Sequence, residues 1–448
     1  MYDIVVIGSG PAGYVAGIRG AQLGKKVCII EKAKLGGVCL NCGCIPTKSL
    51  IADVSILKNI ADGGRVGINV EPPMVDFTKV ISHKENIVKR LAYGIHFLLK
   101  HNGVEVLKGI GSTKEPGCIK IGTKEIITNS IILCSGSSPF VPFVIDHEYI
   151  LTSDEALNLS SIPNSLVIIG GGAVGVEFAT IFSGFKAKVT LVEMLPSILP
   201  EIKDSKIAEI IRNSLMSQGI EVIEGTRVEE ISVVNGHTYS LLSNGDKISA
   251  DKVIVACGRV PNSEEHEALE LKMENKVIVV NERMQTNIPG IYAAGDVTGP
   301  PLLAHKASAE GIVAAENIGM EPKLAPIMDY EAIPCCIFST PEVAWVGKFE
   351  CEVPDARVGE YGFIGVGKAL CIGESTGFVK VVADKECKIK GVQIVGPHAS
   401  ELIPIGILGV KNRLHADELG NLIYPHPTLS ECIKEAFLDV THSAIHKG

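Results

Sequence analysis

Three cysteines lie close together near the N-terminus, in the segment GGVCLNCGCIPTK (36–48). A cysteine thiolate can ligate a metal or exchange electrons through a disulfide, so Cys39, Cys42 and Cys44 are open to two classes of chemistry. Zinc needs about four ligands, and neither a nearby histidine nor a further cysteine pair completes such a set. We therefore expect no metal site and favour a redox-active pair.

Two pairings of these cysteines remain, Cys39 with Cys42 and Cys39 with Cys44. In a regular α-helix, residues five apart lie about 7.5 Å apart along the axis and on different faces, which exceeds the usual Cα separation of a disulfide. Cys39 and Cys44 could pair only if the start of the helix is irregular, and Gly43 and Pro46 offer a cause. Geometry alone leaves both pairings open.

A glycine-rich turn precedes the cysteines and predicts a dinucleotide site. The strand DIVVI leads into Gly8, Gly10 and Gly13 and then into an alanine-rich helix. The glycines permit a tight turn and the close approach of a pyrophosphate to the helix N-terminus, where free N–H groups favour anions. Glu31 ends the next strand, where a carboxylate binds the adenosine ribose.

The same arrangement recurs 162 residues later, after the strand SLVII. Gly170, Gly172 and Gly175 form the second turn, and Glu193 ends the strand that follows. A carboxylate there binds a free ribose hydroxyl and repels a phosphate, while Met194 adds no cation, so we expect NAD rather than NADP. Two dinucleotide sites on one chain indicate a flavin that exchanges electrons with a nicotinamide.

A candidate acid–base pair lies near the C-terminus, in PHPTLSE (425–431). His426 lies between two prolines, which restrict the backbone and thus the position of the ring. A histidine can take a proton from a thiol near neutral pH, and Glu431 could orient the ring and stabilise its charged form. A loop histidine taken alone is more often structural.

The elements that must position these groups are those of an α/β protein. Short β-rich runs alternate with alanine- and glycine-rich stretches of helical length, and the region after about residue 330 changes to antiparallel strands.

The net charge of −9 without a basic cluster makes nucleic-acid binding unlikely, and no apolar run is long enough to span a bilayer. An odd number of cysteines, 13, indicates a reducing compartment.

Several strings together resemble one known family. GGVCLNCGCIPTK and HPTLSE, with GIYAAGDV (290–297), LLAHKA (302–307) and TPEVAWVG (340–347), are similar to the motifs of the pyridine nucleotide–disulfide oxidoreductases, and within them to the dihydrolipoamide dehydrogenases. On that resemblance Cys39 and Cys44 pair, Cys42 falls at a variable position, and His426 with Glu431 forms the catalytic dyad. The outer histidine that usually precedes this dyad is replaced by Tyr424.

The resemblance also implies a set of cofactor contacts. For FAD these are Gly8, Gly10, Gly13, Glu31, Lys48, Gly111, Ser135, Gly136, Ser137, Asp296, Leu302, Leu303, Ala304 and His305. For NAD they are Gly170, Gly172, Gly175, Glu177, Glu193, Val228 and Gly258, with Glu177 also the acidic partner of Lys48. The implied fold is α/β, with an FAD-binding domain (1–140), an NAD-binding domain (141–262), a central region completing the FAD site (263–330) and a C-terminal α+β dimerisation domain (331–448).

The implied reaction is oxidation of dihydrolipoamide, carried on a lipoyl arm, with reduction of NAD to NADH. The implied partners are a second copy of the chain, in a homodimer with shared sites, and the lipoyl domains and acyltransferase core of a 2-oxo acid dehydrogenase complex or glycine cleavage system. We expect a bacterial cytoplasmic location, or the mitochondrial matrix for a processed eukaryotic form. The alternatives are another NAD(P)H-dependent flavoprotein disulfide reductase, or an inactive flavin-binding docking subunit.

Overall fold

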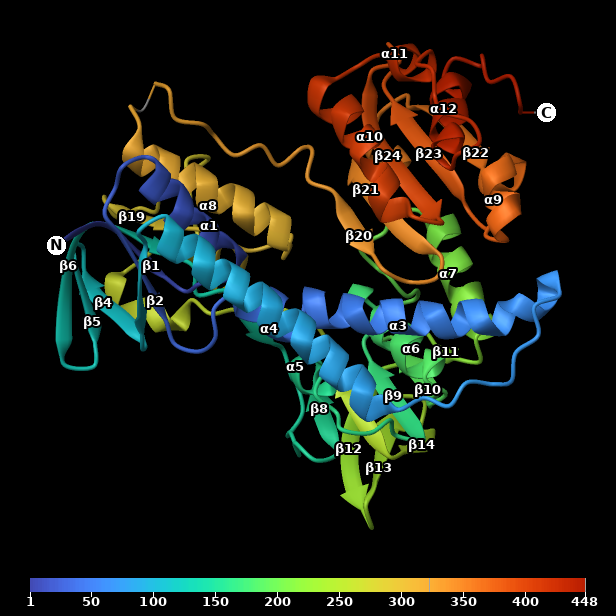
Figure 1. Ribbon diagram of the computed structural model, residues 1–448, viewed down its shortest axis with the longest axis horizontal. Helices are drawn as coiled ribbons and strands as arrows, with labels where there is room; N and C mark the ends of the chain where they lie inside the picture. The colour runs from blue at the N-terminus through green and yellow to red at the C-terminus, as the bar shows by residue number, and fades with distance from the viewer. Residues whose placement is uncertain (322, 448) are drawn as a thin grey trace.

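The computed structural model describes residues 1–321 and 323–447, and a largely parallel sheet forms its N-terminal part (Figure 1). Four parallel strands pair in the order β3-β2-β1-β6, β19 adds to β6, and β5 and β4 continue the sheet in antiparallel fashion. The bounds are β1 Tyr2–Ile7, β2 Val27–Glu31, β3 Glu105–Lys108, β4 Gly111–Glu115, β5 Cys118–Ile121, β6 Lys124–Leu133 and β19 Ile291–Ala293.

Two helices from distant parts of the chain pack against each other on this sheet, α1 (Pro11–Gln22) and α8 (Ala304–Gly319) (Figure 1). Their backbones approach so closely that a Cβ atom on Gly311 would lie 2.4 Å from the carbonyl oxygen of Ala12. A residue with a side chain would force the helices apart. The region that follows residue 263 therefore shares a core with the first glycine turn.

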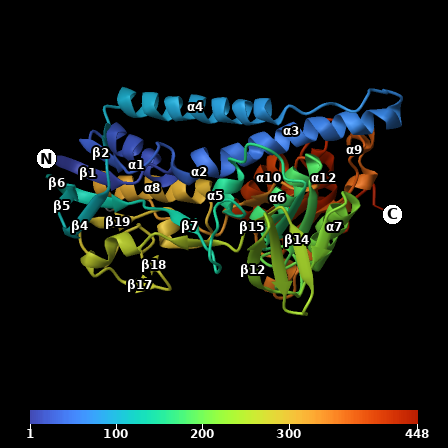
Figure 2. The same ribbon diagram turned by 90° about the horizontal axis from the view of Figure 1, so that it is seen from below.

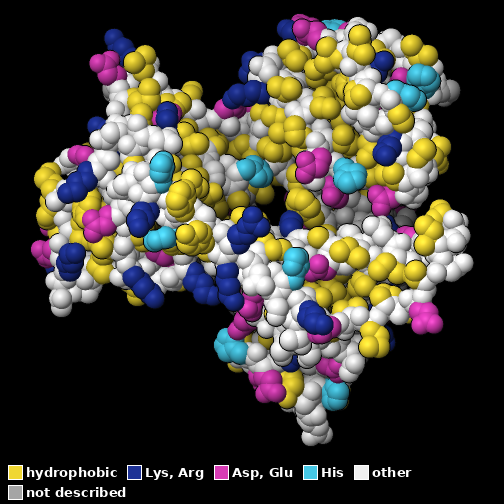
Figure 3. All heavy atoms as spheres, viewed as in Figure 1, with side chains coloured by type: hydrophobic (Ala, Val, Ile, Leu, Met, Phe, Trp, Pro, Cys, Tyr) yellow, Lys and Arg dark blue, Asp and Glu magenta, His cyan; other side chains and the backbone are white. Residues whose placement is uncertain are grey.

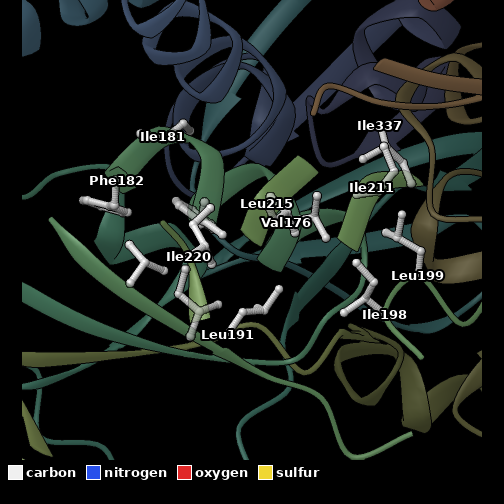
Figure 4. Close-up of a cluster of buried hydrophobic side chains, with 14 of the residues drawn as sticks. Val176, Ile181, Phe182, Leu191, Ile198, Leu199, Ile211, Leu215, Ile220 and Ile337 are labelled. Carbon is white, nitrogen blue, oxygen red and sulfur yellow. The ribbon is translucent and has the colours of Figure 1, made fainter. Parts of the chain in front are cut away.

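A second parallel sheet repeats the first, with the order β11-β10-β9-β15-β8. Its bounds are β8 Ile150–Thr152, β9 Ser165–Ile169, β10 Lys188–Val192, β11 Glu221–Ile223 and β15 Lys252–Val255. In both sheets the strand before the glycine turn, β1 or β9, lies in the middle. On one side is the strand that leads to the acidic residue, β2 or β10, and on the other is a later strand, β6 or β15. Figure 4 shows the apolar side chains that pack in this second unit, among them Val176, Phe182 and Leu191.

Two long helices, α3 (Cys44–Asp62) and α4 (Phe77–His101), run across the molecule and join the two sheets (Figures 1 and 2). α3 packs on α6 (Ala173–Gly184), where a Cβ atom on Gly184 would lie 2.2 Å from Cγ1 of Val54. Because α3 begins at a cysteine of the redox segment, this contact fixes that segment against the second unit.

The C-terminal part is an antiparallel sheet with the order β20-β21-β24-β23-β22. Its strands are β20 Cys335–Ile337, β21 Glu342–Gly347, β22 Arg357–Gly362, β23 Phe378–Ala383 and β24 Ile389–Gly396, and it packs with α10 (Ala399–Asn412) and α12 (Ser430–Asp439). This is the α+β region that the change of pattern predicts.

The α/β fold class with two Rossmann-like units and a C-terminal α+β region is confirmed. The boundaries at residues 140, 262 and 330 stay predictions. Within residues 1–321 and 323–447, none of the helices has the length and apolar character needed to cross a membrane.

Candidate active site

The redox segment is folded as two helices separated by a break. α2 (Gly37–Cys42) ends before Gly43, whose φ of −141° and ψ of −113° are not helical, and α3 begins at Cys44. The helix start is therefore irregular, which is the condition that pairing of Cys39 with Cys44 requires. The structure holds both residues as thiols, and the interaction of their side chains shifts the pKa of each.

The two thiols differ in their tendency to ionise. The hydrogen bond from Cys39 lowers the pKa of the Cys44 thiol, and the positive charge of Lys48 lowers it further against the opposing effect of burial. The same hydrogen bond and burial raise the pKa of Cys39. The pair is thus arranged to carry its negative charge on Cys44, the thiol at the start of α3.

Cys42 has a different electrostatic environment, although it lies in the same short helix as Cys39. Burial and the negative charge of Asp154 raise the pKa of the Cys42 thiol to about 12. Cys39 and Cys44 shift each other's pKa, whereas the pKa of Cys42 responds to Asp154.

Lys48 lies one helical turn beyond Cys44 and is held by an acid of the second unit. Its Nζ lies 3.0 Å and 2.8 Å from the two carboxylate oxygens of Glu177, which is 7% exposed. Oε1 of Glu177 also accepts the backbone N–H of Phe338, and Lys48 lies over the ring of Phe338 at 4.2 Å. This ion pair is the Lys48–Glu177 contact that the resemblance implies.

The first glycine turn has the properties of a pyrophosphate site. The N-cap of α1 is Gly10, which has no side chain that could cover the first amides of the helix. A Cβ atom on Gly13 would lie 1.9 Å from the carbonyl oxygen of Gly8, and one on Gly8 would lie 2.2 Å from that of Cys134. Positions 8 and 13 of the turn therefore require glycine, and the exposed amides fit an anion.

Glu31 lies beside this turn, as expected. Its Oε2 accepts the backbone N–H of Ser9 at 2.8 Å and the Ser9 hydroxyl at 2.6 Å, and its Oε1 accepts the N–H of Ala33. These donors fix the carboxylate at the end of β2. The donors and glycines present here fit the adenosine and pyrophosphate parts of FAD.

Asp296 is joined to the turn at Ser135, Gly136 and Ser137. The Ser137 hydroxyl donates to Oδ2 of Asp296 at 2.6 Å and accepts a hydrogen bond from Nε of Arg259 at 2.9 Å. Gly136 has a φ of +72°, a backbone conformation that glycine adopts without strain. Strands β7 (Ser137–Pro139) and β16 (Arg259–Pro261) pair here, which brings the two units together at Asp296.

The other residues expected near FAD fall into two groups. Leu302 and Leu303 lie just before α8, and Ala304 and His305 are its first two residues. Nε2 of His305 contacts the carbonyl oxygen of Pro334 at 2.7 Å. Gly111 lies at the start of β4, where a Cβ atom would lie 3.2 Å from Ile30. A contact of either group with FAD stays a prediction.

The second glycine turn reproduces the first. Gly172 is the N-cap of α6, and a Cβ atom on Gly175 would lie 1.8 Å from the carbonyl oxygen of Gly170. Glu193 accepts the N–H of Gly171 at 2.6 Å and that of Leu195 at 2.7 Å. This turn therefore fits a second dinucleotide.

Two further residues were expected to contact NAD. Gly258 lies between β15 and β16 with a φ of +104°. Val228 begins β12 (Val228–Val234), and its side chain is buried in an apolar cluster with Val192 and Val255. A contact of Val228 with NAD would therefore have to involve its backbone, and both contacts stay predictions.

His426 and Glu431 form the expected pair. Nδ1 of His426 lies 2.9 Å from Oε1 of Glu431, and Oε2 of Glu431 accepts the N–H of Thr428 at 2.9 Å. Burial tends to raise the pKa of Glu431, but the Thr428 N–H and His426 outweigh it and hold this pKa below its usual value. The His426 side chain is 77% exposed, so its other ring nitrogen is open to a partner.

Several residues that support the site are not evident in the sequence. Asp154 and Arg259 are one example, because they form an ion pair across 105 residues. Another is the buried ion pair Lys306–Glu310, next to Asp296. Nζ of Lys306 donates to the carbonyl oxygen of Gly295, and Glu310 accepts the N–H of Gly295. The i, i+4 spacing of this pair in a helix was a local signal for it.

Comparison with known proteins identifies the family. Residues 2–311 match the family described as pyridine nucleotide-disulphide oxidoreductase, and residues 333–437 match the dimerisation domain of that family. The chain belongs to this family. Members use FAD and NAD, which confirms the two cofactors and the oxidoreductase activity expected from the sequence.

Relatives within the family cover the whole chain. A dihydrolipoyl dehydrogenase of Bacillus subtilis is 38% identical, and one of Geobacillus stearothermophilus is 39% identical; 99% of this chain is covered in both, with 99% and 97% of the relatives. Among solved structures, LpdA from Mycobacterium tuberculosis has a TM-score of 0.90 at 25% identity, covering 97% of this chain and 99% of that one. The HOCl-induced flavoprotein disulfide reductase RclA from Escherichia coli has a TM-score of 0.86 at 26% identity, with the same two coverages.

Proposed function

We propose that the protein is a dihydrolipoyl dehydrogenase, which oxidises the dihydrolipoamide of a lipoyl domain and reduces NAD to NADH. The observation that carries this proposal is the Cys39–Cys44 thiol pair across the break at Gly43, with its charge directed to Cys44 and Lys48 one turn away. Full-length relatives named dihydrolipoyl dehydrogenase support the same substrate.

The chain's own groups account for the dithiol step. His426, as general base, takes a proton from one substrate thiol, and the resulting thiolate attacks Sγ of Cys39 in the oxidised pair. The Cys39–Cys44 bond breaks, and Cys44 leaves as a thiolate, which its lowered pKa favours. The second substrate thiol then attacks the mixed disulfide, so that the substrate closes its own disulfide and Cys39 is released as a thiol.

The two nucleotide sites account for the remaining chemistry of the reaction. Bound FAD would supply electron transfer from the reduced cysteine pair, and bound NAD would accept the electrons as a hydride. The α1 N-terminus, Glu31 and Asp296 would hold FAD, and the α6 N-terminus and Glu193 would hold NAD. The remaining FAD and NAD contacts implied by the resemblance belong to the same proposal.

We further propose that two copies of the chain share each active site. The match of residues 333–437 to a dimerisation domain supports a homodimer. Figure 3 shows hydrophobic side chains gathered over the C-terminal region, and Leu408, Leu422 and Ile423 are 57%, 52% and 100% exposed. The exposed ring of His426 fits a role at the cysteines of the other subunit.

The partners proposed for the dimer are the lipoyl domains and the acyltransferase core of a 2-oxo acid dehydrogenase complex, or the lipoyl carrier of a glycine cleavage system. Relatives from Bacillus subtilis and Geobacillus stearothermophilus support a bacterial cytoplasmic location. An inactive docking subunit is disfavoured, because Cys39, Cys44, His426 and Glu431 are all present.

The test is an anaerobic titration of the purified flavoprotein with dihydrolipoamide, in which the visible spectrum and NADH formation are recorded. We expect dihydrolipoamide to reduce the protein, with a new long-wavelength absorbance. Addition of NAD should then give stoichiometric NADH and restore the spectrum of the oxidised protein. A second titration with other dithiols distinguishes the alternative, a flavoprotein disulfide reductase with another substrate. Flavin reduction by NADH but not by dihydrolipoamide would favour that alternative.

A further inference from the structure

The turn that carries Asp296 has a glycine at each end. Gly295 and Gly299 both have a φ of +90°, which glycine adopts freely and residues with a side chain rarely adopt. Because glycine has many accessible conformations, these two residues alone do not fix the direction of the Asp296 side chain. That side chain accepts a hydrogen bond from Ser137, and the proposed function makes it a ligand of FAD. Other parts of the molecule must therefore hold the turn.

A buried ion pair of α8 holds the backbone of this turn. Oε1 of Glu310 lies 3.1 Å from Nζ of Lys306, and both side chains are almost completely buried. Oε2 of Glu310 accepts the N–H of Gly295 at 2.8 Å. Nζ of Lys306 donates to the carbonyl oxygens of Gly295 at 3.3 Å and of Gly299 at 2.8 Å. The ion pair thus holds the turn at both of its ends.

Tyr330 adds a further donor to this ion pair. Its hydroxyl group donates to Oε1 of Glu310 at 2.7 Å, although the residue is 46% exposed and Glu310 is fully buried. Burial and the carboxylate of Glu310 raise the pKa of Tyr330, so the phenol stays protonated and can donate at neutral pH. Tyr330 therefore joins a segment at the surface to the buried carboxylate that holds Gly295.

The segment around Tyr330 is attached to the C-terminal region. Residues 323–334 connect α8 to β20 (Figure 1). The two neighbours of Tyr330 form ion pairs at the end of α10, Asp329 with Lys411 and Glu331 with Arg413. Exposed ion pairs of this kind are individually weak, but these two flank one side chain and restrict where it can point.

We propose that Tyr330 is a positioning residue for FAD. Through Glu310 and the N–H of Gly295, it holds the turn in the conformation that directs Asp296 towards Ser137, so that the carboxylate is in place before the cofactor binds. Preorganisation of this kind strengthens binding, because less conformational freedom is lost when the ligand binds. The proposal rests on the proposed function for the role of Asp296 as a ligand of FAD.

The test compares FAD release from the native holoprotein and from Tyr330→Phe, which keeps the ring and loses the hydroxyl group. Each protein is diluted, and the FAD that is released is separated by rapid gel filtration at intervals and measured by its absorbance. We expect release to be about tenfold faster in Tyr330→Phe, the scale of one lost hydrogen bond to a charged group. Tyr239→Phe, at a similarly exposed tyrosine of β13 (His237–Leu242), is the matched control and should release FAD at the native rate.

Two further measurements show whether Tyr330 acts through Asp296. Asp296→Asn should also release FAD faster, and adding Tyr330→Phe to it should cause little further change, because the carboxylate that Tyr330 positions is then absent. Hydrogen–deuterium exchange of the peptide that contains Gly295 should be faster in the Tyr330→Phe holoprotein than in the native one, because the N–H of Gly295 donates to Glu310.

The outcomes separate this inference from the proposed function. A native rate of FAD release in Tyr330→Phe overturns the inference, and so does faster release with unchanged exchange at Gly295. A tenfold effect of Tyr330→Phe that persists in the Asp296→Asn background also overturns it, because Tyr330 would then act by another route. If Asp296→Asn itself releases FAD at the native rate, the proposed FAD contact of Asp296 is wrong, and the inference falls with it.

Discussion

Nζ of Lys48 lies 2.8 Å from Oε2 of Glu177, so a single ion pair joins the redox helix to the first turns of α6 in the second dinucleotide unit, 129 residues further along the chain. Glu177 also accepts the N–H of Phe338 next to the C-terminal sheet. Lys48 is therefore fixed with its charge near Cys44 by elements from three parts of the molecule, which its flexible side chain alone could not achieve.

Lys48→Met is expected to raise the pKa of Cys44, because the variant loses the charge that stabilises the thiolate. The thiolate is present above this pKa, so any thiolate-dependent signal should appear at higher pH than in the native protein, by one pH unit for each tenfold loss of thiolate stability. The measurement is the long-wavelength absorbance of the two-electron-reduced flavoprotein against pH. Lys58→Met, in the same helix with its exposed partner Glu374, is the control and should leave the profile unchanged.

Cys39→Ser and Cys44→Ser should each abolish dihydrolipoamide oxidation, whereas Cys42→Ser should retain most of it, because Cys39 and Cys44 match the redox pair of the family and shift each other's pKa. Steady-state NADH formation measures the three variants. In Cys39→Ser the remaining Cys44 thiolate should give a long-wavelength absorbance beside oxidised FAD. Loss of activity in Cys42→Ser alone would instead favour the C-x-x-C pairing.

The local features of the site were predictable from sequence because their residues are close along the chain. Each glycine turn lies about 20 residues before its acid, and the break between Cys39 and Cys44 follows from Gly43. The pairing of Cys39 with Cys44 was left open by geometry, because the backbone angles at Gly43 cannot be read from the residue type.

Contacts between distant segments were not predictable. Asp154 forms an ion pair with Arg259 and its charge raises the pKa of Cys42, yet no spacing rule relates residues on separate strands and helices. Their proximity depends on how the two parallel sheets pack together at β7 and β16. The Lys48–Glu177 pair was expected only from the resemblance, for the same reason.

Glu193→Gln should narrow the preference for NADH over NADPH. In the native protein the carboxylate is fixed by the N–H groups of Gly171 and Leu195, and the following residue, Met194, is exposed and uncharged. A 2′-phosphate placed there would face the carboxylate without a cation from Met194, whereas the glutamine amide carries no charge. The ratio of kcat/KM for the two cofactors is the measurement, and equal use of both by the native enzyme would contradict the assignment.

His266 should make the protein less stable below neutral pH. Its ring is fully buried, Nε2 lies 3.1 Å from the Ser135 hydroxyl, and Nδ1 has no hydrogen-bond partner within the described residues. Burial lowers the pKa of His266 to about 4, from 6.5. Between these two pKa values, His266 is protonated in the unfolded chain and neutral in the folded protein. Stability therefore falls as the pH falls from 6.5 towards 4.

The size of this effect follows from the two pKa values. Between pH 7 and pH 5 the native protein should lose about 2 kcal/mol more unfolding free energy than His266→Gln, whose amide can still donate to Ser135. Urea unfolding of both proteins at the two pH values measures the difference. His101→Gln, at an exposed position, is the control and should behave as the native protein does. An equal pH dependence for native protein and His266→Gln would refute the prediction.

Activity should require a homodimer in which His426 of one subunit serves the cysteines of the other. His426→Gln removes the base without touching either glycine turn, so this variant should keep FAD and lose dithiol turnover. Cys44→Ser should also be inactive, because it lacks one thiol of the redox pair although its His426 is intact. When the two variants exchange subunits, each mixed dimer should contain one site with intact cysteines and an intact His426, and its activity should return to about half the native value. Mixed dimers that are verified by mass spectrometry and remain inactive, or a dilute monomer with full turnover, would show that each chain uses its own histidine.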